Sequence, residues 1–228
     1  MKNIRKIFIT GILMTVVITA NAQLDLGIKA GVNLSAFSGF VAPVSEVEQS
    51  NVLGFHAGLT LQYMFTSKMG IESGLLYSVL GSKITGTLPN VKGECTFNPS
   101  YLQLPVSLLY KFKLADDLYL YPSLGLYAGY GMGGNWKAVY SGNINFQFEG
   151  NIFKEDTPAS NPLSPVISAD PLDFGFTAGL TFQVNRITLG FGFEQGLSQF
   201  DKEMLPKTTF GKGGWSNQNI RVSLGFFF

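Results

Sequence analysis

Charged side chains that could do chemistry are distributed along this 228-residue chain. They occupy polar positions in segments where polar and apolar residues alternate, so they share one face. Three are acidic and three are basic. Because an unpaired charge is costly in a low dielectric, this balance is typical of an interior held by ion pairs and hydrogen bonds. With two uncharged members added, the predicted interior network is Asp25, Lys29, His56, Glu72, Gln103, Lys111, Glu194 and Arg221.

His56 is the only histidine of the chain. Histidine changes its charge near neutral pH, which makes this residue a candidate general base. A membrane-embedded hydrolase or acyltransferase acting on lipid would need such a histidine beside a serine nucleophile and an orienting acid. No spacing demonstrates that arrangement. We therefore predict a hydrogen-bonded interior histidine and no catalytic residues, with the lipid enzyme as the alternative.

Other chemical signals in the sequence are weaker. One histidine and one cysteine, Cys95, are too few for a zinc site, so we predict no metal and no cofactor. The run GYGMGG, with Gly129, Gly131 and Gly134, matches the dinucleotide fingerprint. That fingerprint needs a helix after it, whereas residues 135–148 keep bulky residues at extended spacing. We interpret the run as the end of a strand that enters a loop.

The elements that carry these residues are predicted to be strands. Apolar and polar residues alternate with a period of two, as in Leu24, Asp25 and Leu26, and this is typical of a strand with two unlike faces. Pro105 and Pro122 fall inside two such segments, and because proline lacks a ladder N–H we expect a bulge or kink near each. The eight segments are 24–34, 55–65, 70–80, 101–112, 118–130, 173–184, 187–194 and 219–228.

Connections between these segments alternate between long and short. Short turns fall at 66–68, 115–117 and 185–186, and long connections run through 35–53, 84–100, 131–172 and 198–216. This pattern predicts an all-β fold, an eight-stranded antiparallel up-and-down transmembrane β-barrel with its termini and short turns in the periplasm. Part of the longest connection, 136–153, could extend the barrel as a hairpin. We expect any protein partner in the envelope to bind loops 35–53, 131–172 and 198–216.

Two other barrels fit the alternation less well. In a soluble lipocalin-like barrel the polar face would meet water. Here that face is mostly Gly, Ser, Thr and Gln, and only 14% of all residues are charged. Aromatic residues also gather at the segment ends, where a membrane barrel carries its interfacial girdle. A narrow pore stays open as an alternative, although eight strands enclose only enough space for side chains. A net charge of +1 gives no field that would attract nucleic acid.

The first 22 residues have the pattern of a secretory signal peptide. Lys2, Arg5 and Lys6 precede an apolar stretch over 7–20, and Ala20-Asn21-Ala22 supplies small residues for cleavage. At roughly fourteen residues the stretch is shorter than the ~20 that a spanning helix needs. We therefore predict a signal peptide at 1–22 and a barrel domain at 23–228, exported to the outer membrane.

Several segments resemble a known family. The opening LGIKAGVNLS, the strands YLQLPVSLLYKF and LYLYPSLGLYAGYGMG, and the ending IRVSLGFFF are similar to the Bacteroidota outer-membrane β-barrel domain family, often labelled PorT-like. The resemblance implies a small barrel like OmpA or OmpX in a Gram-negative outer membrane, in contact with its lipid, and no enzyme activity. Phe226 and Phe228 look like the C-terminal aromatic signal used by the barrel-insertion machinery. What the resemblance leaves open is a role in secretion.

Overall fold

The computed structural model describes residues 24–39, 47–88, 91–142, 145–153, 166–205 and 214–228, so the predicted signal peptide lies outside the described residues. All regular structure in these ranges is β-strand, and no described helix is long and apolar enough to cross a membrane. The strands are β1 (Leu24–Ser38), β2 (Val47–Met64), β3 (Met69–Val79), β4 (Ser82–Leu88), β5 (Val91–Tyr110), β6 (Phe112–Lys113), β7 (Leu118–Gly142), β8 (Phe146–Asn151), β9 (Val166–Ala169), β10 (Leu172–Val184), β11 (Ile187–Gly196), β12 (Asp201–Leu205) and β13 (Ser216–Phe227).

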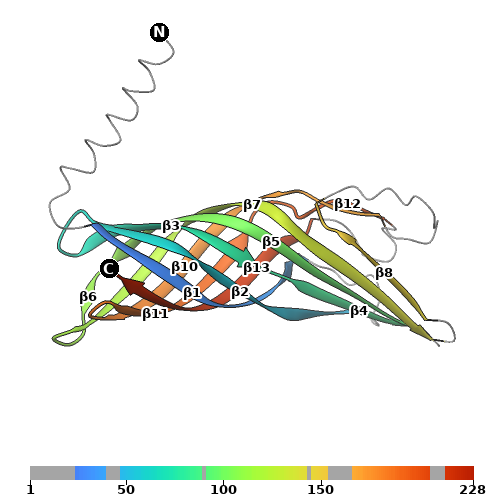
Figure 1. Ribbon diagram of the computed structural model, residues 1–228, viewed down its shortest axis with the longest axis horizontal. Coiled ribbons are helices and arrows are strands. Elements are labelled where there is room, and N and C mark those ends of the chain that lie inside the picture. The colour runs from blue at the N-terminus through green and yellow to red at the C-terminus, as the bar shows by residue number, and fades with distance from the viewer. Residues whose placement is uncertain (1–23, 40–46, 89–90, 143–144, 154–165, 206–213) are drawn as a thin grey trace, which may run out of the picture.

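Eight of these strands form a closed ring. β1, β2, β3, β5, β7, β10, β11 and β13 each pair antiparallel with the next, and β13 pairs back with β1. The first and last ring strands lie side by side, with the described N-terminal residues and the C-terminus at the same end (Figure 1). The predicted eight-stranded up-and-down β-barrel is therefore confirmed.

The strands of the ring are strongly staggered. Following paired residues once around the ring from Leu26 returns to β1 at Ala36, ten residues further along the same strand. With ordinary strand rise and spacing, this stagger tilts the strands by about 40°. The path passes through Leu26, Leu61, Ser73, Val106, Leu126, Phe176, Gln195, Gln218 and Ala36.

The outer surface of the ring is apolar and its interior is polar. Leu126 and Leu224 are 65% and 62% exposed on the outside, whereas His56 and Gln103 are each 1% exposed on the inside. On β1 the exposed apolar residues run from Leu24 to Leu34, which spans about 25 Å along the axis at this tilt and matches the apolar band of membrane barrels. This arrangement is the reverse of a soluble barrel, so the lipocalin-like alternative is wrong. The period-two alternation of the sequence produces this apolar outer surface and polar interior directly.

Beyond the apolar belt the same sheet continues as a projecting part. Its order is β2, β4, β5, β7 and β8, built from residues 47–51, 82–88, 91–98, 135–142 and 146–151, which we call the extension (Figure 1). The prediction of a long loop over 84–100 is therefore wrong, because these residues form most of β4 and the first part of β5. The hairpin predicted within 136–153 is confirmed as the end of β7 and β8.

The extension reverses the polarity of the barrel. Its outer face carries an ion pair between Lys83 and Glu94, about one-third exposed, and its inner face is apolar. On that side Phe37 of β1 stacks against Phe200 and Trp215, at 4.6 and 5.6 Å between ring centroids. The buried members of this apolar core are Phe37, Ile84, Cys95, Phe97, Trp136, Ala138, Ile152, Ala169, Phe200 and Trp215.

The two prolines interrupt the ladder less than predicted. No register shift occurs at Pro105 or Pro122, although the β3–β5 pairing is interrupted at Leu104 and Pro105. The one register irregularity between β5 and β7 lies between Ser100 and Tyr101. Gly134, which pairs with the adjacent Pro99, has a φ of +142°, a conformation that glycine adopts without strain. The ladder stays in register because the lost proline N–H affects one bond, while neighbouring pairs on both sides persist.

Candidate functional site: the barrel interior

Four of the predicted interior charges, two acids and two bases, form two ion pairs inside the barrel. Lys29 of β1 lies 2.5 Å from Glu72 of β3, and Arg221 of β13 lies 2.5 Å from Glu194 of β11. Glu194 is the most deeply placed, with 3% of its side chain exposed. Arg221 also donates to the Thr177 hydroxyl at 3.3 Å. The structure therefore brings these four charges together as two ion pairs.

Three other predicted members of the network lie elsewhere or lack partners. Asp25 is exposed at the start of β1, at one end of the barrel, where water can solvate it. Lys111 lies after β5 with its ammonium 4.1 Å from the centre of the Tyr119 ring, so it makes a cation–π contact rather than an ion pair. Gln103 points inward and is buried, but its amide makes no hydrogen bond to the described residues. The prediction was too broad because alternation gives the face of a side chain and not its height in the barrel.

His56 is the centre of a directional hydrogen-bond relay. Its Nδ1 lies 2.8 Å from Oδ1 of Asn33 and its Nε2 lies 2.8 Å from Oγ of Ser223. The Asn33 amide nitrogen donates to the carbonyls of Phe55 and Val79, at 2.9 and 3.1 Å. Its oxygen must therefore accept from His56, so Nδ1 carries the hydrogen and Nε2 accepts from Ser223. The backbone thus fixes the tautomer of the imidazole.

This hydrogen-bond relay is connected to the ion pair between Glu194 of β11 and Arg221 of β13. Asn219 donates to Glu194 at 3.1 Å and to the Asn33 oxygen at 3.4 Å. A chain of hydrogen bonds therefore runs from Ser223 through His56, Asn33 and Asn219 to Glu194. The predicted interior network did not include Asn33, Asn219 or Ser223, although each stands at an inward position of an alternating strand.

A second polar cluster surrounds Asp173, which the predicted network omitted. This carboxylate is 4% exposed and accepts hydrogen bonds from Ser198 at 2.7 Å, Asn217 at 3.0 Å and Tyr127 at 3.2 Å. Asn217 also donates to the Tyr101 hydroxyl at 3.2 Å. Among the described residues Asp173 has no ion-pair partner, so neutral donors offset its charge. Asp173 stands at an inward-facing position of the alternating strand β10, and this alternation was the signal that could have identified it.

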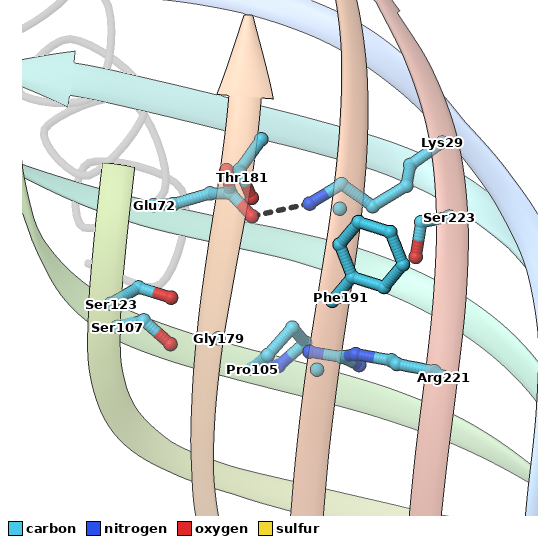
Figure 2. A pocket seen from close by; sticks show the side chains of 12 residues that line it. Lys29, Glu72, Pro105, Ser107, Ser123, Gly179, Thr181, Phe191, Arg221 and Ser223 are labelled. Atoms are coloured by element: carbon cyan, nitrogen blue, oxygen red, sulfur yellow. Dashed lines mark hydrogen bonds and ion pairs between the residues drawn. The ribbon is translucent and has the colours of Figure 1, made fainter. Parts of the chain in front are cut away.

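A small polar cavity lies beside the ion pairs. Lys29 and Arg221 point into it from neighbouring strands, with Glu72 held by Lys29 (Figure 2). Its volume is about 30 Å³, which is room for roughly two water molecules and far below the ~300 Å³ of ordinary small-molecule sites. Hydroxyls that line it belong to Ser107, Ser123, Thr181 and Ser223.

Apolar side chains bound the polar interior on both sides. Toward the extension it ends at the core around Phe37. Toward the end with the termini, Met64, Leu109 and Tyr121 form a second buried cluster, with Tyr119 packed against it. The polar layer is thus enclosed between two apolar layers. In the described part of the chain no cluster of three or more His, Cys, Asp or Glu could hold a metal ion.

The glycine run and the C-terminal aromatics are also placed by the structure. Gly129, Gly131 and Gly134 all lie in β7, so the run is part of a strand, but the predicted loop after it is wrong because β7 continues to Gly142. Phe226 and Phe228 are 39% and 63% exposed on the outer surface, with ring centroids 5.9 Å apart. Their use as an insertion signal stays a prediction.

Comparisons with known proteins place the chain in a family. Residues 19–202 match the outer membrane protein beta-barrel domain, a region with seven of the eight ring strands. Among solved structures, Ail of Yersinia pestis, in complex with the heparin analogue sucrose octasulfate, is 13% identical and covers 90% of this chain and 99% of its own, with a TM-score of 0.37. Neisserial surface protein A is 9% identical, with coverages of 90% and 97% and a TM-score of 0.37.

OprG from Pseudomonas aeruginosa is 13% identical, with coverages of 90% and 95% and a TM-score of 0.48. No curated protein matches the chain. The family match covers most of the chain, and the ring of strands carries its apolar surface outward as that family requires in a lipid bilayer. The chain therefore belongs to the outer membrane protein beta-barrel domain family.

Proposed function

We propose that this barrel has a structural or interaction role at the outer membrane: surface contact, envelope integrity, or service as a subunit of a larger envelope complex. The extension carries this proposal, because it is a folded sheet with its own apolar core that stands beyond the lipid-facing belt. A protein that only anchored itself in lipid would not need it. Recognition commonly resides in such projecting segments on a rigid scaffold.

In the orientation that we propose, the extension faces the outside of the cell and both termini face the periplasm. The short turns, the first described residues of β1 and the C-terminus share one end of the barrel, and the extension occupies the other (Figure 1). Up-and-down outer-membrane barrels place short turns in the periplasm and longer segments outside. Cleavage of residues 1–22, insertion through Phe226 and Phe228, and an affinity to the PorT-like barrels of Bacteroidota belong to the same proposal.

Site-specific photo-cross-linking in intact cells tests the interaction role. A benzophenone amino acid at Lys137, exposed on the outer face of the extension, should capture a reproducible protein that mass spectrometry identifies. The same probe at Leu126, exposed on the lipid-facing belt, is the matched control and should capture lipid or nothing. A partner captured equally from both positions, or from neither, would contradict a partner on the extension and leave envelope integrity as the role.

A narrow pore is a second candidate function, and the structure of the lumen argues against it. The ion pairs and the two apolar layers occupy the path along the axis, so purified protein in planar bilayers should give no stable unit conductance. Steady open currents would show that this interior rearranges.

An enzyme that modifies lipid is tested by lipid A mass spectra, which should be the same with and without the gene.

A further inference from the structure

The sheet of the extension has one strand with a neighbour on one side only. In the order β2, β4, β5, β7 and β8, the two marginal strands are β2 and β8. The margin at β2 lies against β1, because the Gln49 side chain donates to the Phe37 carbonyl at 2.6 Å. Among the described strands β8 pairs with β7 alone, and it lies at the projecting end of the molecule (Figure 1). The margin at β8 is therefore an edge to which another strand can add.

The backbone along this edge presents hydrogen-bonding groups. Ile152, directly after β8, donates its N–H to the Gly134 carbonyl of β7 at 3.1 Å. Alternate residues of an antiparallel strand direct N–H and C=O to the same neighbour. In this register residues 148 and 150 face β7, whereas Gln147 and Glu149 direct their backbone groups away from it. No backbone hydrogen bond joins these two residues to another described segment, so their N–H and C=O groups form a template for an added strand.

The side chains beside the edge define what an added strand must carry. Glu149 is exposed on the outer face, and it forms no ion pair within the described residues although Lys137 is its cross-strand neighbour. On the inner face Phe146 is 46% exposed, and Phe148 packs edge-on against Tyr140 with 6.2 Å between ring centroids. A matching strand therefore places a basic residue opposite Glu149 and apolar residues beside the two phenylalanines.

We propose that the edge of β8 binds an extended segment of a partner protein by strand addition, and that this segment alternates apolar with polar residues and carries a basic one opposite Glu149. This inference rests on the interaction role proposed for the extension and names how the partner is held. Backbone hydrogen bonds supply the affinity, and the alternate side chains supply the specificity.

Two other occupants match the edge less well. A second copy of β8 (Phe146–Asn151) contains no basic residue, so it would bring Glu149 close to a like charge. The part of this chain that follows β8 carries Pro158, Pro162 and Pro165, and proline has no N–H to donate to a ladder. A strand of another protein, with a lysine or arginine among alternating apolar residues, is the occupant that the edge fits.

The probe is a fluorescein-labelled heptapeptide in which valine alternates with threonine and a single lysine. Folded barrel in detergent, verified by its heat-modifiable migration on electrophoresis, is titrated into the peptide, and fluorescence anisotropy gives the Kd. We expect saturable binding. N-methylation of the lysine and of the next threonine blocks the two N–H groups that meet Gln147 and Glu149, and should weaken binding about tenfold or more. N-methylation of two valines, whose N–H groups face away, is the matched control and should have little effect.

Variants of the barrel test the same contact from the other side. Q147P removes an N–H that β7 does not use, and should weaken peptide binding about tenfold, whereas Q147A keeps that N–H and should bind as the wild type does. E149K should weaken binding about threefold or more, since it replaces an attraction with a repulsion.

Three results would overturn the proposal: no saturable binding to the folded wild type, equal binding of the two methylated peptides, or equal binding to folded Q147P and Q147A. A wild-type dimer in detergent that Q147P converts to a monomer, measured by sedimentation, would assign the edge to a second copy instead. Capture of a partner from Lys137 without peptide binding would leave the interaction role standing and refute strand addition alone.

Discussion

Ion pairs in this protein differ in how fully each one is removed from water. Glu194 has 3% of its side chain exposed and is held by Arg221 and Asn219, whereas Glu72 is 24% exposed and is held by Lys29. Glu94, on the outer face of the extension, is 36% exposed. Since breaking a buried pair leaves an uncompensated charge, the cost of losing the acid should follow this order.

Neutralising each acid in turn tests that order. E194Q should destabilise the barrel most, by about 3–5 kcal/mol, because Arg221 would stay buried without its carboxylate. E72Q should cost less, and the exposed control E94Q should cost no more than about 1 kcal/mol. Urea unfolding in lipid vesicles, followed by tryptophan fluorescence, measures all three. An equal loss for E194Q and E94Q would contradict the burial argument.

Glycines on the inner face provide a second test at the level of single residues. An added Cβ at Gly31 would lie 2.0 Å from the Val222 carbonyl oxygen, so the backbone of the neighbouring strand would have to move. G31A should cost about 1–3 kcal/mol, the usual cost of overpacking a rigid site. Gly133 is the matched control, since nothing lies within 4 Å of its Cβ position and G133A should be close to neutral. The same unfolding assay compares them, and equal stability would refute the clash.

At the scale of elements, the extension behaves as a small folded unit on top of the barrel. Its apolar core joins β1, β4, β5 and β7, and Phe37, Phe97 and Trp215 are each no more than 4% exposed. The ring strands β5 and β7 are continuous with it. This continuity explains why segments expected to be loops are ordered as strands.

The thiol of Cys95 reports on that core. It is 5% exposed, and burial raises its pKa to about 12. Since the thiolate is the reactive form, the folded protein should react with iodoacetamide at neutral pH at a rate at least a hundredfold below that of the urea-unfolded chain. A variant with the surface change K137C and Cys95 replaced by Ala is the control and should react rapidly when folded. Rapid labelling of native Cys95 would show that the core of the extension opens.

At the scale of the whole molecule, one surface is built for lipid and another for water. The belt is about 25 Å tall, and beyond it the outward positions change from leucine and phenylalanine to lysine, glutamate and threonine. Lipid should therefore contact the molecule only over the ring. Within the belt the outer surface is apolar and the interior is polar. In the extension the outer surface is polar and the interior is apolar. At each level, therefore, the inner and outer faces have opposite polarity.

A charge introduced on each surface tests this division. Leu126 is 65% exposed within the belt, so L126R should destabilise the barrel by about 2–4 kcal/mol, since it would place a guanidinium in the hydrocarbon region. The control T96R lies in the β5 part of the extension, at a half-exposed position beside the buried Cys95 and Phe97, and should change stability by less than about 0.5 kcal/mol. Folding into vesicles, monitored by heat-modifiable migration, compares the two. A neutral L126R would place this part of the ring outside the bilayer.

The sequence by itself determined the ring of strands and which side chains face inward, because a period of two residues assigns each side chain to a face without knowledge of any neighbour. It therefore predicted Lys29, Glu72, Glu194 and Arg221 as inward charges, together with Asp25 and Lys111, without assigning any pair. Which acid meets which base depends on the stagger of ten residues around the ring, and this is a property of closure.

Only the tertiary structure decided that Asp25 lies outside the network, that β4 continues the sheet, and that His56 lies between Asn33 and Ser223. Ser223 and His56 are 167 positions apart in the chain. They meet because β13 closes onto β1, whose other neighbour is β2, and Gly31 between them has no side chain to keep the two apart. Local alternation carries no information on contacts across a closing seam, so this arrangement became visible only in the folded barrel.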